Sequence, residues 1–434
     1  MTLVFADARL IDPETGYDGP GSLVVEGGAI AALHHDEAPA PVGPGRRIDC
    51  AGRVLAPGLV DMRVFVAEPG ARHRESFRSA GRAAAAGGVT TIVAQADTQP
   101  PLDDPALVRL ALDRGRASAP VRVAAMGALT RGLQGREMTE QRFLLDAGAV
   151  ALSDADHAVA DTAVMRAILS YATSTGALVV HHPQDAALSA RGCATSGEFA
   201  TRLGLPSVPA VAERIGLERD LALAEATGAR LHADVVSTAG ALGPMARAKA
   251  AGVDVTAGTT IHHLTLNEYD VGEWRSFFKL APPLRAEDDR RALVEALAEG
   301  LIDVVASGHA PWDTEAKRLP FEEAAVGAIG LETFLPAMMR LVHAGDLSMV
   351  RLFEAAALAP ARRLGLPGGR LAVGQPADLV LFDPDKPFLL DRARLRSKSK
   401  NTPFDRTRME GRVIGTWVGG ERVFDAETEA VAAG

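Results

Sequence analysis

The middle of the chain alternates short apolar runs with longer stretches in which apolar residues recur every three or four positions. An apolar run bounded by turn residues predicts a buried strand, and the longer period predicts an amphipathic helix. The eight apolar runs are 59–66, 90–94, 121–125, 149–152, 178–182, 230–235, 254–257 and 303–306. Helical stretches separate them, for example 74–86, 162–173, 211–227 and 288–299. Eight successive strand–helix units predict a parallel (β/α)8 barrel of the TIM type.

The two ends of the chain follow another pattern. Short β-prone runs separated by Gly, Pro and Asp fill residues 1 to about 55, and similar runs return between 377 and 424. Glycines and prolines near 366–369 mark the return. We therefore expect a small β-sandwich domain built from both termini, 1–55 and 366–434, beside a (β/α)8 barrel formed by 56–365. Chemistry in such a barrel sits where strands run into loops at their carboxyl ends.

Composition narrows the class of protein. With 434 residues, 47% of them hydrophobic, the chain can bury a core large enough for both units. A net charge of −9 argues against a nucleic-acid partner, which would need basic clusters. The two cysteines, Cys50 and Cys193, are too few for a disulfide framework. With no signal peptide and no apolar run of about 20 residues, we expect a cytoplasmic protein without a membrane partner.

One stretch carries a specific resemblance. Residues 57–70 read PGLVDMRVFVAEPG, which resembles the signature P-G-L-V-D-x-H-V-H-L-R-E-P-G of the dihydroorotases, cyclic amidohydrolases of pyrimidine biosynthesis. Further matches follow in order along the chain: 87–91 (GGVTT), 127–130 (GALT), 147–154 (AGAVALSD) and 397–404 (SKSKNTPF). The resemblance covers nearly the whole chain and implies the barrel fold. Activity is a separate question, because function depends on the site and not on the scaffold.

The first strand end departs from the signature. In the family, the two histidines hold a metal ion and the following arginine binds the substrate carboxylate. This chain has Arg63, Phe65 and Ala67 at those three positions. A guanidinium has no acceptor atom and a phenyl ring has no ligating atom. Two ligands of the metal centre implied by the resemblance are therefore missing here.

Later strand ends carry further substitutions. By the resemblance, Val235 replaces a ligating histidine after the sixth strand, and Gly308 replaces the aspartate that serves as metal ligand and proton shuttle. Trp312 replaces a histidine that faces the substrate, while Asp97 and Ala281 replace asparagines of the substrate site. Loss of a positioned general base alone costs roughly 10²–10⁴-fold in rate.

Four positions keep the family residue, and we interpret them as remnants of the active site that the resemblance implies: Asp154, His182, His232 and His309. Plainer alternatives exist for three of them. Asp154 suits a helix N-cap, His182 suits a hydrogen-bonded core histidine, and His232 suits packing inside a strand. We expect that the chain has no catalytic residues and binds no cofactor. The alternative is a reduced zinc site formed by Asp154, His182 and His232.

The charged substitutions lead to one structural prediction. Carboxylates that have lost a metal ion are costly to bury without another positive charge. We therefore expect the Arg63 guanidinium to occupy the metal region and to pair with Asp154 or Asp97. Asp234 lies on an apolar strand and should also need a partner.

Three functions are compatible with these residues. The first is a non-catalytic dihydroorotase-like protein that is a structural or regulatory partner of aspartate carbamoyltransferase, as bacterial relatives lacking metal ligands imply. We expect such a protein to form a homo-oligomer. The alternative is an active dihydroorotase or related cyclic amidohydrolase, which hydrolyses a cyclic amide C–N bond with a rebuilt zinc site. The third is a regulatory module that binds another small molecule in the old cavity.

Overall fold

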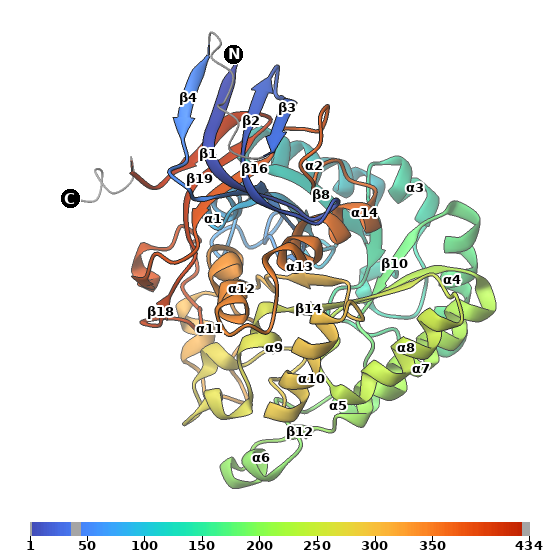
Figure 1. The fold of residues 1–434 in the computed structure, drawn as a ribbon. Helices are drawn as coiled ribbons and strands as arrows, with labels where there is room; N and C mark the ends of the chain where they lie inside the picture. The colour runs from blue at the N-terminus through green and yellow to red at the C-terminus, as the bar shows by residue number, and fades with distance from the viewer. Residues whose placement is uncertain (1, 36–44, 428–434) are drawn as a thin grey trace.

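A parallel barrel forms the centre of the computed structural model, which describes residues 2–35 and 45–427 (Figure 1). Its eight strands are hydrogen-bonded in sequence order: β6 (Leu59–Val64), β7 (Val89–Ala94), β8 (Arg122–Gly127), β9 (Ala151–Ser153), β10 (Leu178–His181), β13 (Arg230–Ala233), β14 (Val255–Thr260) and β15 (Val304–Ala306). The barrel closes just beyond β15, where Val64 pairs with His309 and the Phe65 amide donates to the His309 carbonyl at 2.9 Å.

Helices cover the outside of the barrel (Figure 1). The helices of the described residues, some of which lie in the loops, are α1 (Phe77–Ala86), α2 (Pro105–Ser118), α3 (Gln141–Asp146), α4 (Thr162–Thr175), α5 (Ala186–Ser189), α6 (Glu198–Leu203), α7 (Val211–Thr227), α8 (Ala239–Ala250), α9 (Ile261–Thr265), α10 (Glu287–Ala298), α11 (Thr314–Arg318), α12 (Phe334–His343), α13 (Met349–Phe353) and α14 (Ala359–Leu364). Helix α1 shows why such segments fold. Ser76 and Ser79 form a capping box at its start, and Phe77, Ala80 and Ala84 bury one face.

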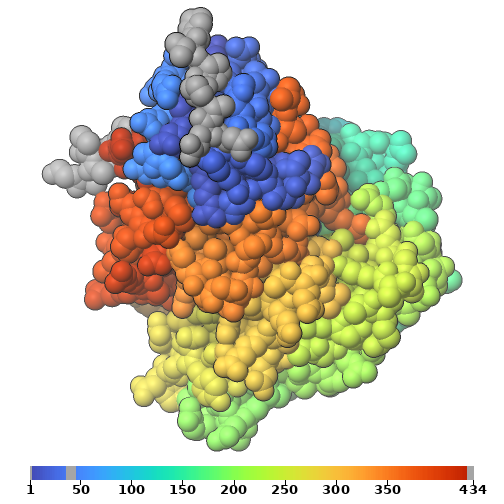
Figure 2. All heavy atoms as spheres, in the orientation of Figure 1, coloured from blue at the N-terminus to red at the C-terminus, as the bar shows by residue number. Residues whose placement is uncertain are grey.

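A second eight-stranded sheet combines both ends of the chain. Its members are β1 (Leu3–Asp12), β2 (Tyr17–Glu26), β3 (Ala29–His35), β4 (Arg46–Asp49), β5 (Val54–Pro57), β16 (Leu379–Asp383), β19 (Arg412–Val418) and β20 (Glu421–Asp425). The sheet has its own apolar core, in which Phe5 meets Trp417 edge to face with ring centroids 4.9 Å apart. In Figure 2 the blue N-terminal strands lie directly on the orange segment that contains α12, α13 and α14.

The terminal sheet is joined to the barrel by polar contacts. Arg122 of β8 donates to both carboxylate oxygens of Asp378, at 2.6 and 3.0 Å. The Thr416 hydroxyl donates to the carbonyl of Ala85, the penultimate residue of α1, at 2.7 Å. Two-stranded pairs complete the fold: β11 (Ala194–Thr195) with β12 (Ser207–Val208), and β17 (Phe388–Leu389) with β18 (Arg408–Met409). The predicted (β/α)8 barrel is confirmed, and the two termini, predicted to form a β-sandwich domain, combine in one eight-stranded sheet.

All eight predicted barrel strands are present, with ends that shift by up to three residues. Helix α1 begins at Phe77 instead of 74, because Ser76 adopts an extended backbone and caps the helix. The division into 1–55 with 366–434 and 56–365 stays a prediction. Within residues 2–35 and 45–427, no helix is long and apolar enough to cross a membrane.

Candidate functional site

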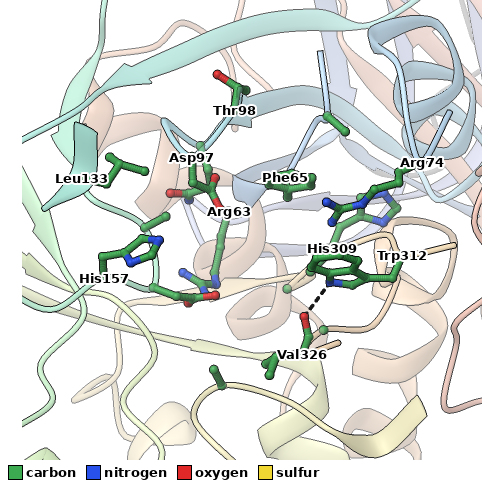
Figure 3. Close-up of a pocket in the computed structure, with 18 of the residues that line it drawn as sticks. Arg63, Phe65, Arg74, Asp97, Thr98, Leu133, His157, His309, Trp312 and Val326 are labelled. Atoms are coloured by element: carbon green, nitrogen blue, oxygen red, sulfur yellow. Dashed lines mark hydrogen bonds and ion pairs between the residues drawn. The ribbon is translucent and has the colours of Figure 1, made fainter. Parts of the chain in front are cut away.

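The carboxyl ends of the barrel strands surround a cavity of about 630 Å³. Its wall comes from the ends of β6, β7, β14 and β15 and from the loops after them and after β9. Figure 3 shows two halves with different chemistry. Arg63, Asp97 and His157 lie in a polar half, whereas Arg74 and Trp312 lie in an aromatic half beside Phe65. This cavity is the place where a barrel of this type would carry its chemistry.

Arg63 occupies the centre of the polar half. It lies at the end of β6, where its Nη1 donates to Asp234 and its Nη2 donates to Asp156. The side chains of Arg63 and Asp234 are only 11% and 5% exposed, so this contact is shielded from water. Burial favours the neutral guanidine, but the charges of Asp156 and Asp234 outweigh it and raise the pKa of Arg63. Arg63 is therefore a fixed internal cation.

The predicted partners of Arg63 were wrong, although its role as a counter-ion was anticipated. Asp154 instead accepts from the amides of Leu129 and Thr130 at 2.8 and 2.9 Å, and from the Thr130 hydroxyl. It ties the loop after β8 to the loop after β9, and it is neither a helix N-cap nor part of the cavity wall. Asp97 acts on Arg63 through its charge. The need of Asp234 for a partner is met by Arg63.

Asp97 and Gln95 follow β7 and line the cavity with acceptor atoms. Gln95 donates from Nε2 to the Met62 carbonyl at 3.3 Å. Among residues 2–35 and 45–427, neither Gln95 Oε1 nor Asp97 Oδ1 has a hydrogen-bond partner, and both atoms are buried. Burial, reinforced by the nearby charge of Asp156, raises the pKa of Asp97 to about 6.

Two adjacent histidines at the end of β10, His181 and His182, have different surroundings. His181 is the histidine that hydrogen bonds hold in the core: its Nδ1 lies 2.6 Å from Asp220 Oδ2, and its Nε2 accepts from the Val159 amide at 2.9 Å. His182 Nδ1 has no hydrogen-bond partner among the described residues. Burial lowers the pKa of His182 to about 4, so this ring is neutral at pH 7. His182 is nevertheless buried and has a hydrogen bond to the backbone of Asp234, so the plainer alternative of a core histidine stays a prediction.

The other two retained histidines also have packing contacts. His232 lies within β13, where its Nδ1 is 2.8 Å from the Thr256 hydroxyl, and burial lowers its pKa to about 3. His309 accepts from the Gly330 amide at 3.3 Å through Nδ1, and its Nε2 lies 3.5 Å from Glu75. His309 lines the cavity, whereas His232 lies outside its wall.

The aromatic half of the cavity holds a second cation. The Arg74 guanidinium lies 3.4 Å from the ring centroid of Trp312 and 4.8 Å from that of Phe65. Its Nη2 donates to the Pro311 carbonyl at 2.8 Å. Trp312 itself donates from Nε1 to the Val326 carbonyl at 2.7 Å, as the dashed line in Figure 3 shows. Ala67 and Ala281 also line the cavity and offer it only small apolar side chains.

Two substituted positions have unusual backbones. Val235 is buried with φ of 60°, a conformation that a β-branched residue adopts at a cost of about 1–3 kcal/mol. Gly308 has φ of 64°, and a Cβ placed on it would lie 3.1 Å from Thr260 Cγ2 and 3.2 Å from His262 Nδ1. Position 308 therefore has little room for any side chain.

The residues at these strand ends do not fit a zinc ion. Within the described ranges, no group of three or more His, Cys, Asp or Glu side chains is placed to hold a metal. The alternative ligand set is not brought together, because Asp154 is bound to Thr130 and His232 is bound to Thr256. The guanidinium of Arg63 stands between the two carboxylates nearest to it and repels a cation.

Sequence reasoning missed two structural carboxylates. Asp156 follows Asp154 by two residues, and the repeat of aspartates in a strand-end loop was a signal for it. Glu213 lies on α7 but is fully buried, where it accepts from the amides of Ser237 and Thr238 at 2.9 Å each. Nothing in a helical sequence distinguishes Glu213 from a surface residue. It fixes the loop after β13, next to Asp234.

Comparison with known proteins gives consistent matches along the chain. The profile of the Dihydro-orotase-like family matches residues 52–240, and that of the Amidohydrolase family matches 337–424. A dihydroorotase from Anaeromyxobacter dehalogenans strain 2CP-1 is 41% identical over 98% of this chain and 98% of its own length. A dihydroorotase from Pelobacter propionicus is 40% identical over 98% of this chain and 100% of its own. An L-hydantoinase (dihydropyrimidinase) from Arthrobacter aurescens superimposes with a TM-score of 0.88 at 27% identity, covering 98% of this chain and 96% of its own.

Proposed function

We propose a function for this chain from the premise that it belongs to the dihydroorotase family of cyclic amidohydrolases. Our proposal is a non-catalytic member of that family, which acts as a structural or regulatory partner of aspartate carbamoyltransferase. The observation that carries it is the position of Arg63, whose guanidinium is hydrogen-bonded to Asp234 and Asp156 at the mouth of the barrel.

The requirements of metal-dependent hydrolysis, which this site does not meet, support the proposal. A zinc centre lowers the pKa of a bound water and needs neutral imidazoles or carboxylates free to ligate. Here the carboxylate of Asp234 is already neutralised by Arg63, and Phe65 supplies no ligating atom. Binding a divalent cation would require breaking a buried ion pair, which is strongly unfavourable.

A second candidate is an active dihydroorotase or related cyclic amidohydrolase with a rebuilt zinc site. The names of the relatives favour it, since the family is typically zinc-dependent and several dihydroorotases share about two fifths of this sequence. The side chains at the strand ends do not favour it, because among the described residues no three of them are placed to hold a metal ion. The two candidates differ in a property that can be measured directly.

The partner is proposed on the resemblance to bacterial relatives that lack metal ligands, and the barrel suits a scaffolding role. Most residues of the barrel strands are buried, and the Arg63–Asp234 ion pair links two strand ends at the mouth. A homo-oligomeric state and a cytoplasmic location stay predictions of the same proposal.

One preparation tests both candidates. The full chain is purified alone and together with the aspartate carbamoyltransferase of the same organism. Zinc content, dihydroorotate hydrolysis and aspartate carbamoylation are then measured on each sample. We expect co-elution of the two proteins, zinc well below one ion per chain and no dihydroorotate turnover. Stoichiometric zinc with turnover would establish the second candidate, and failure of the proteins to co-elute would remove the proposed partner.

A further inference from the structure

We propose that the cavity at the mouth of the barrel binds a small organic cation, whose ammonium or guanidinium head is held by Asp97 and Gln95. The ligand is a compound with an N–H-rich positive head and a short hydrocarbon part. This inference rests on the proposed function, because the cavity is then not committed to a metal-bound substrate. Three properties of the cavity favour such a ligand: its charge, its unmatched acceptor atoms and its shape.

The charge of the polar half is unbalanced. Asp97, Asp156 and Asp234 supply three carboxylates, and Arg63 supplies one guanidinium to offset them. Arg74 adds a second positive charge that acts on Asp97, but its guanidinium stacks on Trp312 and donates to the Pro311 carbonyl, and the carboxylates still outnumber the guanidiniums. Excess negative charge in a partly dehydrated cavity attracts a cation more strongly than it would in water. An anionic ligand is disfavoured for the same reason.

The hydrogen-bonding groups point to the same kind of ligand. Asp97 Oδ1 and Gln95 Oε1 are both buried and have no donor among residues 2–35 and 45–427. Gln95 is 3% exposed, and its amide nitrogen is already used by Met62, which fixes the orientation of its oxygen. Buried acceptors without a donor cost free energy unless a ligand or water supplies one. The Nη1 and Nη2 groups of Arg63 donate to Asp234 and Asp156.

The shape of the cavity sets the rest of the ligand. A volume of about 630 Å³ lies within the range of small-molecule sites. Phe65 lies between the polar half and the Arg74–Trp312 stack, so it offers an apolar surface next to the acceptors (Figure 3). Leu133 lies on the opposite side of the polar half in the same view. A head group bonded to Asp97 would therefore place a short hydrocarbon chain against Phe65.

The test measures binding to the full chain after treatment with a chelator. The probes are n-butylguanidine, which has a guanidinium head, and n-butylamine, which has an ammonium head. Butyrate serves as the anion of matched size. Isothermal titration calorimetry and thermal unfolding should show binding of at least one cation and none of butyrate. The choice between n-butylguanidine and n-butylamine identifies the head group.

Variants locate the bound cation. Asp97→Asn removes the charge at constant size and should weaken cation binding at least tenfold. Asp113→Asn removes an exposed carboxylate on α2, far from the cavity wall, and should leave binding unchanged. Gln95→Leu removes the second acceptor and provides an independent test if Asp97→Asn does not fold. We expect it to weaken binding several-fold.

Two results would overturn the inference: neither cation binds the folded chain, or both Asp97→Asn and Gln95→Leu bind as tightly as the parent protein. Zinc content and dihydroorotate turnover are measured on the same batch before chelation. Zinc with turnover overturns the proposed function whatever the cations do. A chain without zinc or turnover that binds neither cation overturns the inference alone, so the two failures are distinguishable.

Discussion

Arg63, at the end of the first barrel strand, donates a hydrogen bond to Asp234, which directly follows the sixth, so a buried ion pair links two strands that are not neighbours. Asp156, after the fourth strand, accepts from the same guanidinium. One side chain thereby connects three strand ends around the mouth of the barrel. A group in this position is expected to contribute both to stability and to the exclusion of metal ions.

Arg63→Ala should lower the free energy of unfolding by about 3 kcal/mol at pH 7. The substitution leaves Asp234 buried without its counter-ion, and a buried charge that has lost its partner is strongly destabilising. Unfolding in urea, followed by circular dichroism, measures the change. The matched control is Arg116→Ala, which removes an exposed ion pair with Asp113 and should cost less than about 1 kcal/mol. Equal losses for the two variants would contradict the role assigned to Arg63.

His232→Asn should make stability less sensitive to acid. Burial lowers the pKa of His232 to about 3, whereas the unfolded value is about 6.5. Between these values the unfolded chain binds the extra proton, so the stability contributed by neutral His232 is lost as pH falls through that window. The parent protein should lose about 2 kcal/mol from this site between pH 7.5 and pH 5, and the variant should not.

The measurement is urea unfolding of both proteins at the two pH values. His73→Asn is the control, because His73 is 70% exposed and its replacement should leave the pH dependence unchanged. If the parent and His232→Asn lost the same free energy on acidification, His232 would titrate normally in the folded state.

Asp61→Asn should have the opposite effect on the pH profile. Asp61 is fully buried, and burial raises its pKa to about 6. Between about pH 4 and pH 6, Asp61 is protonated in the folded chain but ionised in the unfolded chain. The free energy of unfolding therefore falls as pH rises through that range. Asparagine retains an acceptor for the amides of Arg63 and Ser307, which each donate to Asp61 Oδ1 at 3.2 Å. The variant should therefore remove a loss of up to about 3 kcal/mol between pH 4 and pH 7.

Unfolding free energies at pH 4.5 and pH 7.5 give this comparison, with the exposed Asp113→Asn as control. If the parent and Asp61→Asn showed the same pH dependence of unfolding, the Asp61 carboxylate would be ionised in the folded chain throughout this range. Since His232 and Asp61 act with opposite signs, each variant must be compared with the parent at both pH values.

The sequence predicted the strands well and the partners of Arg63 poorly, and the reason is physical. A buried strand has to be apolar on both faces, so its pattern is visible without the structure. Which of Asp154 and Asp156 faces the cavity depends on the backbone of the loop, where Ala155 has φ of 52°. Likewise, only the register of β10 decides that His181 meets Asp220 while His182 does not.

Glu213 shows a second limit of sequence reasoning. Its carboxylate is buried because the loop after β13 folds back onto α7 and offers the amides of Ser237 and Thr238. A contact between residues 24 positions apart leaves no periodic trace in either segment. The substitutions at Arg63 and Phe65, by contrast, were readable because the surrounding signature fixed their positions. Chemistry that is carried by a motif is thus easier to predict than chemistry that depends on loop geometry.

Gly308→Asp tests whether the barrel mouth still has room for a carboxylate after β15. A Cβ at this position would lie 3.1 Å from Thr260 and 3.2 Å from His262, both of which are buried. We expect this variant to be less stable by about 1–3 kcal/mol than Gly300→Asp, because overpacking a buried site forces neighbours to move. Gly300 is a matched control, since it also has positive φ but has nothing within 4 Å of the added atom. The two variants share the backbone strain, so urea unfolding isolates the packing effect. If the two variants were equally stable, or if only Gly308→Asp bound zinc, the mouth of the barrel would have room for the carboxylate. The proposed loss of the metal site would then rest on Arg63 and Phe65, without Gly308.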